Sequence, residues 1–169
     1  MIDLDKTQIN EFFDRLDLLS KGERTQLKRN AGRLLDEVDA RTLSTFFTVL
    51  PSGQKNMLDR WLSAACIHCL WDNSTHRVSP EHAIGDLVRK KALTESYLGR
   101  VYALMDTEWD RDGFMIDKYL KLMKMLKSKG YSIDGRFVLE DLITWNSDYR
   151  IAQKRWAKAI ANIQETEGE

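Results

Sequence analysis

Apolar residues recur at helical spacing along nearly the whole chain. The segments that show this spacing are 5–19, 24–38, 42–50, 54–71, 81–91, 95–106, 114–129, 134–145 and 148–163. A half-buried strand would instead alternate strictly between apolar and polar residues, and no stretch of any length does so. The pattern therefore predicts an all-α protein.

Short polar signals mark where several of these helices begin. Ser20 and Glu23 have the spacing of a capping box, which predicts a helix start at this point. Thr94 is suited to cap the helix that follows it. The polar segment 72–80, which ends in a proline, is the clearest loop in the chain.

The same pattern suggests how the chain is organised. At 169 residues it can form one domain or two small ones. We place a soft boundary near residues 92–95, which gives an N-terminal bundle at 1–93 and a C-terminal bundle with a basic face at 94–169. The expected architecture is two small helical bundles packed in one elongated chain.

Composition narrows the class of protein. The hydrophobic fraction is 43% and the charged fraction 31%, as in soluble globular proteins, and no apolar run approaches the roughly 20 residues of a membrane span. The N-terminal residues lack the layout of a signal peptide, and the chain has only two cysteines. We therefore expect a cytoplasmic protein without a membrane partner.

The net charge is zero, with 26 basic and 26 acidic residues, but the charges are unevenly distributed. Acidic residues gather at the two ends of the chain: Asp3, Asp5, Glu11, Asp14, Asp17, Glu165, Glu167 and Glu169. Residues 20–163 hold 24 bases and 18 acids, and residues 113–163 alone hold ten bases and five acids. Since local potential attracts a polyanion even when the total charge is zero, the neutral sum does not exclude a nucleic-acid partner.

Three helical segments carry the basic residues. The last helix is predicted to bury an apolar face that includes Trp156 and to present cations opposite it. In the helix 114–129, lysines recur at every third position from 118 to 127, and a third basic flank follows residue 27. The candidate nucleic-acid-binding residues are Lys28, Arg29, Arg33, Arg100, Lys121, Lys124, Arg150, Lys154, Arg155 and Lys158.

Each basic segment also has a simpler interpretation. Lysines on a largely buried helix extend along apolar surface and place only their ammonium groups in water, and charged helix faces are usually just solvated. Most tryptophans (Trp61, Trp71, Trp145 and Trp156) occupy apolar helical positions, which favours core packing over base stacking.

Catalytic and metal-binding patterns are weak. The sequence has neither a nucleophile elbow of the Gly-x-Ser-x-Gly type nor a glycine-rich phosphate loop. Cys66, Cys69, His76 and His82 only approach the spacing of zinc ligands, and we favour core packing of both cysteines. Residues 108–113 imitate the start of a calcium loop, but a capped turn explains them better. We expect no enzymatic activity, no metal and no cofactor.

Several short stretches resemble one family when taken in order. They are QLKRNAG at 26–32, TFFTVLP at 45–51, AIGDL at 83–87, RVYAL at 100–104, LEDLITW at 139–145 and RWAK at 155–158. Together they resemble the CasB family, whose members are the small subunit of Cascade, the type I-E CRISPR surveillance complex. The resemblance covers residues 20–163.

The resemblance implies a non-catalytic, all-helical protein of two bundles. It implies that the protein lies in Cascade beside the backbone and large subunits, and beside a second copy of the same chain. It also implies sequence-independent contact with guide RNA and target DNA that stabilises the R-loop in antiviral defence. The family's basic positions match Lys28, Arg29, Arg100, Lys121, Lys124, Arg150, Lys154 and Arg155.

A protein of a different class remains the alternative. A helical protein–protein adaptor would carry the same basic faces merely solvated. Geometry distinguishes the two hypotheses, because the adaptor hypothesis fails if Lys28, Arg29, Lys124, Arg150 and Arg155 converge on one continuous surface.

Overall fold

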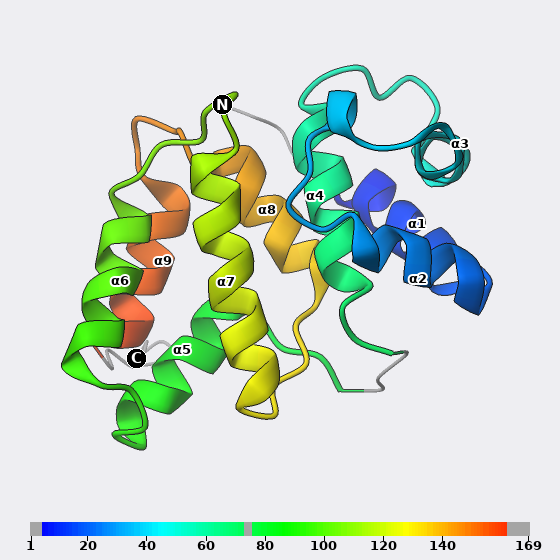
Figure 1. Ribbon diagram of the computed structural model, residues 1–169. Helices are drawn as coiled ribbons and strands as arrows, with labels where there is room; N and C mark the ends of the chain where they lie inside the picture. Colours follow the sequence, from blue (N-terminus) through cyan, green and yellow to red (C-terminus); the bar gives the residue numbers. More distant parts are fainter. Residues whose placement is uncertain (1–4, 73–75, 162–169) are drawn as a thin grey trace.

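The computed structural model describes residues 5–72 and 76–161 (Figure 1). The acidic residues Asp3, Glu165, Glu167 and Glu169 lie outside these ranges. Within them the helices are α1 (Lys6–Asp17), α2 (Lys21–Arg29), the short 3-10 helix η1 (Leu35–Glu37), α3 (Ala40–Val49), α4 (Leu58–His68), α5 (Pro80–Arg89), α6 (Glu95–Met105), α7 (Phe114–Ser128), α8 (Gly135–Thr144) and α9 (Ile151–Ile160). The predicted all-α class is confirmed.

Two of the predicted caps are present. The Ser20 hydroxyl accepts from the backbone N–H of Glu23, and the Glu23 carboxylate accepts from the N–H of Ser20, which completes the capping box. Thr94 accepts from the backbone N–H of Tyr97 at the start of α6. These local signals fix the starts of α2 and α6.

The predicted helix 24–38 is wrong beyond Arg29. The chain turns at Gly32, whose φ of 88° lies in the left-handed region, and forms only the 3-10 turn Leu35–Glu37. The side-chain amide of Asn30 donates to the backbone carbonyl of Gln26 at 2.8 Å, and so caps one of the carbonyls at the end of the helix. The second helix is therefore short, and the turn after it packs against other parts of the chain.

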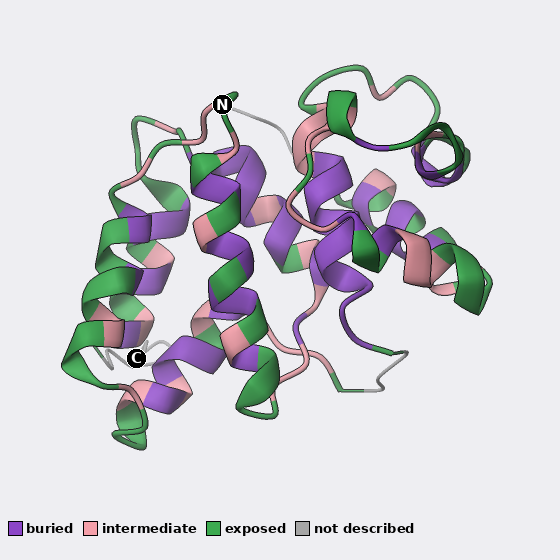
Figure 2. Ribbon diagram, in the orientation of Figure 1, coloured by how far each residue is buried: buried purple, intermediate pink, exposed green. Residues whose placement is uncertain are grey.

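The prediction for 54–71 is also too long at its start. The helix begins only at Leu58, after Met57, whose φ is 57°. All residues from 61 to 71 are nevertheless buried, so this segment is central to the core as expected (Figure 2). Trp61, Trp71, Trp145 and Trp156 are buried too, which confirms their core role.

The helices form two packed groups (Figure 1). In the first, α4 packs against α2, and α3 packs against α1 and α2. In the second, α7 packs against α5 and α6, and α9 packs closely against α5. Helix α8 joins the groups, because it contacts α1 and α4 on one side and α9 on the other.

The division into two domains at residue 93 stays a prediction, but the packing of the helices does not follow that boundary. Helix α5 lies before residue 93 and packs mainly against α9, while α8 lies after it and packs mainly against α4. A short parallel bridge between Val78 and Ile133 ties the loop before α5 to the segment before α8. Across 5–72 and 76–161, no helix has the length and apolar content needed to span a membrane.

Candidate nucleic-acid interface

The basic residues that follow Leu27 lie at the end of α2 and in the turn after it. Lys28, Arg29 and Arg33 are all exposed. This turn packs directly against α7, since a Cβ on Gly32 would come within 2.9 Å of Leu120 Cδ2. The end of α2 is thereby held beside the middle of α7.

Lys28 and Lys127 bring two positive charges together at this junction. The ammonium of Lys127 donates to the carbonyl of Leu70, two residues after the end of α4, at 2.5 Å. Burial lowers the pKa of Lys127, and the neighbouring Lys28 lowers it further. No carboxylate of the described chain forms an ion pair with either ammonium. The two ammonium groups repel each other, and a bound anion would reduce this repulsion.

The same surface continues along α7 to α6. Lys124 is exposed one turn before Lys127, and Lys121 is exposed a turn earlier, where it pairs with Asp117 at 2.9 Å. Arg100 of α6 is also exposed and stacks on the ring of Tyr97, 5.8 Å from its centroid. Figure 1 shows α7 between α6 and the first helical group, so the segments that carry these cations are neighbours in the fold. We call this set (Lys28, Arg29, Arg33, Arg100, Lys121, Lys124 and Lys127) the α2–α7–α6 face.

A groove of about 270 Å³ opens on this face between α6 and α7. Its floor is apolar, with Val101, Leu104 and Leu122, and its rim carries three cations. The lining residues are Tyr97, Arg100, Val101, Ala103, Leu104, Lys118, Lys121 and Leu122. No carboxylate is among them, so the groove combines an apolar base with a positive edge.

Arg150, which precedes α9, and the three cations within α9 have different surroundings. Arg150 pairs with Asp106 at 3.0 Å and donates to the carbonyl of Met105. Arg155 pairs with Asp141 at 2.7 Å and approaches Glu81 at 3.8 Å. Lys154 and Lys158 are exposed. Arg150 and Arg155 thus have carboxylate partners within the chain, whereas no ion pair of the described residues involves Lys28, Arg29 or Lys124.

Asp141 is the centre of a buried polar cluster. Its side chain is fully buried and accepts from the hydroxyl of Tyr119 at 3.0 Å, the indole of Trp156 at 3.1 Å and Arg155. Burial raises the pKa of Asp141 to about 7; Glu81 adds to the rise, whereas Arg155 and Tyr119 oppose it. Arg155 thus has a structural partner, a role that its position on the helical wheel does not reveal.

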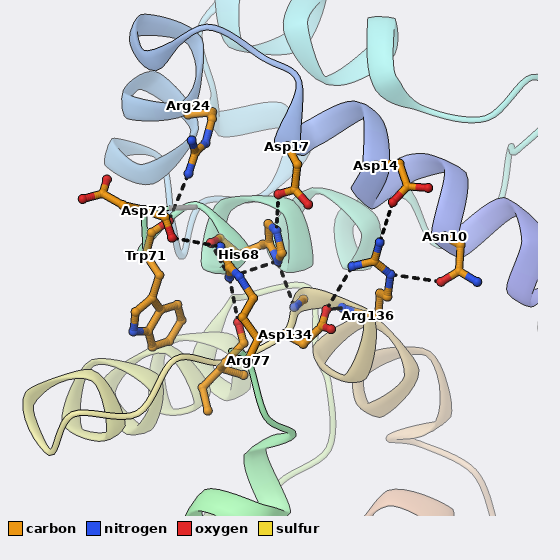
Figure 3. Close-up of polar contacts among 12 residues, drawn as sticks. Asn10, Asp14, Asp17, Arg24, His68, Trp71, Asp72, Arg77, Asp134 and Arg136 are labelled. Atoms are coloured by element: carbon orange, nitrogen blue, oxygen red, sulfur yellow. Dashed lines mark hydrogen bonds and ion pairs between the residues drawn. The ribbon is translucent and has the colours of Figure 1, made fainter. Parts of the chain in front are cut away.

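A second buried network surrounds His68, and sequence reasoning missed it (Figure 3). His68 Nδ1 accepts from the backbone N–H of Gly135 at 3.0 Å and faces Arg77 at 3.2 Å. Both neighbours are donors, so we assign the proton to Nε2, which lies 2.8 Å from Asp17 Oδ1. Burial lowers the pKa of His68; the hydrogen bond to Asp17 opposes this shift and Arg77 adds to it.

This network joins the two helical groups. Arg77 also donates to the carbonyls of His68 and Ile133, and Arg136 pairs with Asp14 at 2.8 Å (Figure 3). A Cβ at Gly135 would lie 2.3 Å from Phe13 and 2.7 Å from the Cβ of His68, so only glycine fits. One signal could have indicated the site: His68 stands alone in an otherwise apolar run.

The possible metal ligands do not converge. Cys66 and Cys69 are buried in the core, as predicted, and burial raises the pKa of Cys66 well above its usual value and that of Cys69 to about 11. The Asp110 carboxylate accepts from the backbone of Asp112 and Phe114, which confirms a capped turn. In the part of the chain that the structure describes, no group of three or more histidine, cysteine or acidic residues could hold a metal ion.

Comparison with known proteins finds similarity in the fold and none in sequence families. No protein-family model matches the sequence, and none of the curated proteins matches it. Among solved structures, CasB from M. ruber has a TM-score of 0.71 and 18% identity, with 92% of this chain and 93% of that chain covered. A chain of a CRISPR RNA-guided surveillance complex has a TM-score of 0.72 and 17% identity, covering 92% of each.

A third structure is similar over an even larger part of its length. It is a CRISPR-associated protein of the Cse2 family from Thermus thermophilus, with a TM-score of 0.73 and 19% identity; 94% of this chain and 99% of that chain are covered. The chain is therefore Cse2/CasB-like in fold, and this likeness includes both helical groups.

Proposed function

We propose that this chain is the non-catalytic small subunit of a CRISPR RNA-guided surveillance complex. The likeness in fold carries the proposal, since it extends over more than nine tenths of this chain and of a chain from such a complex. The ordered sequence resemblance to the CasB family supports it independently. The proposed setting is antiviral defence in the cytoplasm.

The proposed activity is sequence-independent binding of nucleic-acid phosphates by the α2–α7–α6 face. Phosphate contacts hold a strand in place without reading its bases. R-loop formation is a nearly balanced exchange of one duplex for another, so a few such contacts can shift it. Lys28 and Lys124 are both exposed, and neither has an ion-pair partner in the described chain; Arg29, Arg33, Arg100 and Lys154 meet the same two conditions.

The proposed partners follow from the same assignment. They are the backbone and large subunits of Cascade, a second copy of this chain, the guide RNA and the target DNA. Because the chain is neutral overall, we expect the isolated subunit to bind nucleic acid weakly and the assembled complex to bind it more tightly.

The test combines assembly with a salt series. The tagged chain is co-expressed with the other Cascade subunits and a guide RNA, and the purified complex is titrated with target DNA between roughly 50 and 200 mM salt. We expect stoichiometric incorporation, and a log–log salt slope that is steeper with the subunit than without it, by about 0.7 to 0.9 per phosphate contacted. Incorporation with an unchanged slope would favour the adaptor hypothesis, and no incorporation would refute the proposal.

A further inference from the structure

The groove between α6 and α7 has features that simple phosphate binding does not require. Its floor is formed by Val101, Leu104 and Leu122, which are nearly inaccessible to solvent yet line the opening. Tyr97 forms part of the wall, and burial raises the pKa of its phenol. A solvated surface that only attracted phosphates would not need this apolar floor.

The rim of the groove specifies the charge of its occupant. Arg100, Lys118 and Lys121 reach it from two helices, and Lys118 lies over the ring of Phe114, 4.4 Å from its centroid. Of these three cations, Lys121 forms an ion pair, with the exposed Asp117, and no ion pair of the described residues involves Arg100 or Lys118. An occupant should therefore carry a flat apolar part for the floor and negative charge at its edge.

We propose that this groove holds one unstacked base of a single-stranded nucleic acid, with the neighbouring phosphates on Arg100, Lys118 and Lys121. A base has an apolar face and is attached to phosphates on both sides, which matches the floor and rim. The volume of about 270 Å³ lies below the range of pockets for drug-sized ligands and suits a single ring system. Stacking and apolar contact tolerate any base, so the site stays independent of sequence.

This inference rests on the proposed function and makes it more specific. A duplex keeps its bases stacked and paired, so only a single strand can supply a base to the groove. The chain would therefore prefer single-stranded over duplex nucleic acid beyond what phosphate charge explains. Lys124, one turn further along α7, would contact the strand as it leaves the groove.

The test compares an intact oligothymidylate with the same strand carrying abasic sites, which retain every phosphate. The full chain, alone and assembled in the complex, is titrated with each labelled strand at several salt concentrations. We expect the intact strand to bind roughly 5- to 150-fold more tightly, from the usual contribution of one base contact. The salt slopes should be equal, because the phosphates are equal.

A variant in which a larger side chain fills the groove complements this comparison of strands. Ala103 is exposed and lines the groove, so Ala103→Phe should occupy it without disturbing the core. This variant should bind intact and abasic strands equally, with the salt slope of the wild type. Ala40→Phe places the same ring at an exposed position of α3 and should retain the preference. Thermal unfolding checks that both variants fold.

The possible failures are distinguishable. If the wild type binds both strands equally and tightly, the base site is wrong and the phosphate-binding function stands. If it binds neither strand, alone or in the complex, the proposed function fails as well. If strand preference is absent and Ala103→Phe prevents assembly with the other subunits, the groove holds a protein side chain and the inference is overturned.

Discussion

Two cations of the α9 region, Arg150 and Arg155, and two of the α2–α7–α6 face, Lys28 and Lys124, differ in what they contact. Arg150 and Arg155 form ion pairs with Asp106 and Asp141, and the second pair reaches into the core. Lys28 and Lys124 have no carboxylate partner among the described residues, and Lys28 lies beside another ammonium group. A cation that neutralises a buried carboxylate stabilises the fold, whereas one that faces solvent or a like charge can bind a phosphate.

Removal of Arg155 should have the largest effect. Arg155→Ala leaves Asp141 buried without its charged partner, and we expect a loss of about 2–4 kcal/mol in the free energy of unfolding at pH 8. Arg155 is 37% exposed, so water weakens the pair and the loss should lie below the top of the range for buried pairs. Urea denaturation measures it, with Lys154→Ala as the exposed neighbour for control. If Arg155→Ala were stable but bound DNA weakly, Arg155 would be a nucleic-acid contact instead of a residue that stabilises the fold.

The pH dependence of stability should be the next largest effect. The pKa of Asp141 is about 7 in the folded chain and near 3.8 when unfolded, so the folded state holds an extra proton between these values. Its contribution to stability is therefore greatest at acidic pH and is lost as pH rises from about 4 to about 7. Between pH 5 and pH 8 the loss is on the order of 2 kcal/mol.

His68 opposes this trend, so the two groups must be separated. Its folded pKa lies below the ordinary 6.5, and its contribution is lost as pH falls below that value. Asp141→Asn removes the first contribution only. The difference between wild-type and variant unfolding free energies should thus fall from pH 5 to pH 8, and a constant difference would show that Asp141 does not titrate in this range.

Charge reversal should distinguish the two basic regions in DNA binding. Lys28→Glu with Lys124→Glu should lower the affinity for single-stranded DNA about tenfold or more and reduce the salt slope by about 1.4, because two phosphate contacts are lost. Lys154→Glu with Lys158→Glu tests α9 in the same way and should have the smaller effect. Lys55→Glu in the loop before α4 serves as control. Equal losses in both double variants would extend the interface to α9.

The exposed pair of Arg150 should contribute least. Arg150 is 52% exposed and Asp106 74%, so Arg150→Ala should cost less than about 1 kcal/mol. The backbone of Arg150 has a φ of 49°, which glycine adopts without strain. Arg150→Gly should therefore be at least as stable as Arg150→Ala in thermal unfolding. A less stable glycine variant would mean that the conformational freedom of glycine in the unfolded chain outweighs the relief of backbone strain at this position.

Helical periodicity predicted every long helix of the described chain, but not all their limits. Local signals such as Ser20 and Thr94 were sufficient where the cap and the helix are adjacent. The end of α2 depends instead on contacts far away, since Gly32 packs on Leu120 and the N–H of Leu35 donates to Asp59. Gly32 and Asn30 are local signals for this helix end, but the pattern around them does not reveal the partners Leu120 and Asp59.

The candidate site shows the same limit. Basic helix faces were visible in sequence, and residues such as Lys28 and Lys124 are exposed as predicted. The partner of Arg155 on α8 and those of His68 at positions 17, 77 and 135 lie in separate segments of the chain. Only the folded arrangement distinguishes a cation that holds the core from one that faces solvent.

The position of α8 has a consequence for how the chain is made. Helix α4 ends at His68, yet the helix that covers it most extensively ends at Thr144. At the usual rate of protein synthesis, roughly 4 to 15 seconds separate the two. During that interval the apolar surface of α4 is not yet covered by α8, and the hydrogen bond from Gly135 to His68 cannot form. We expect the first helical group to become compact only after the second is almost complete, so that chains cut short before α8 aggregate.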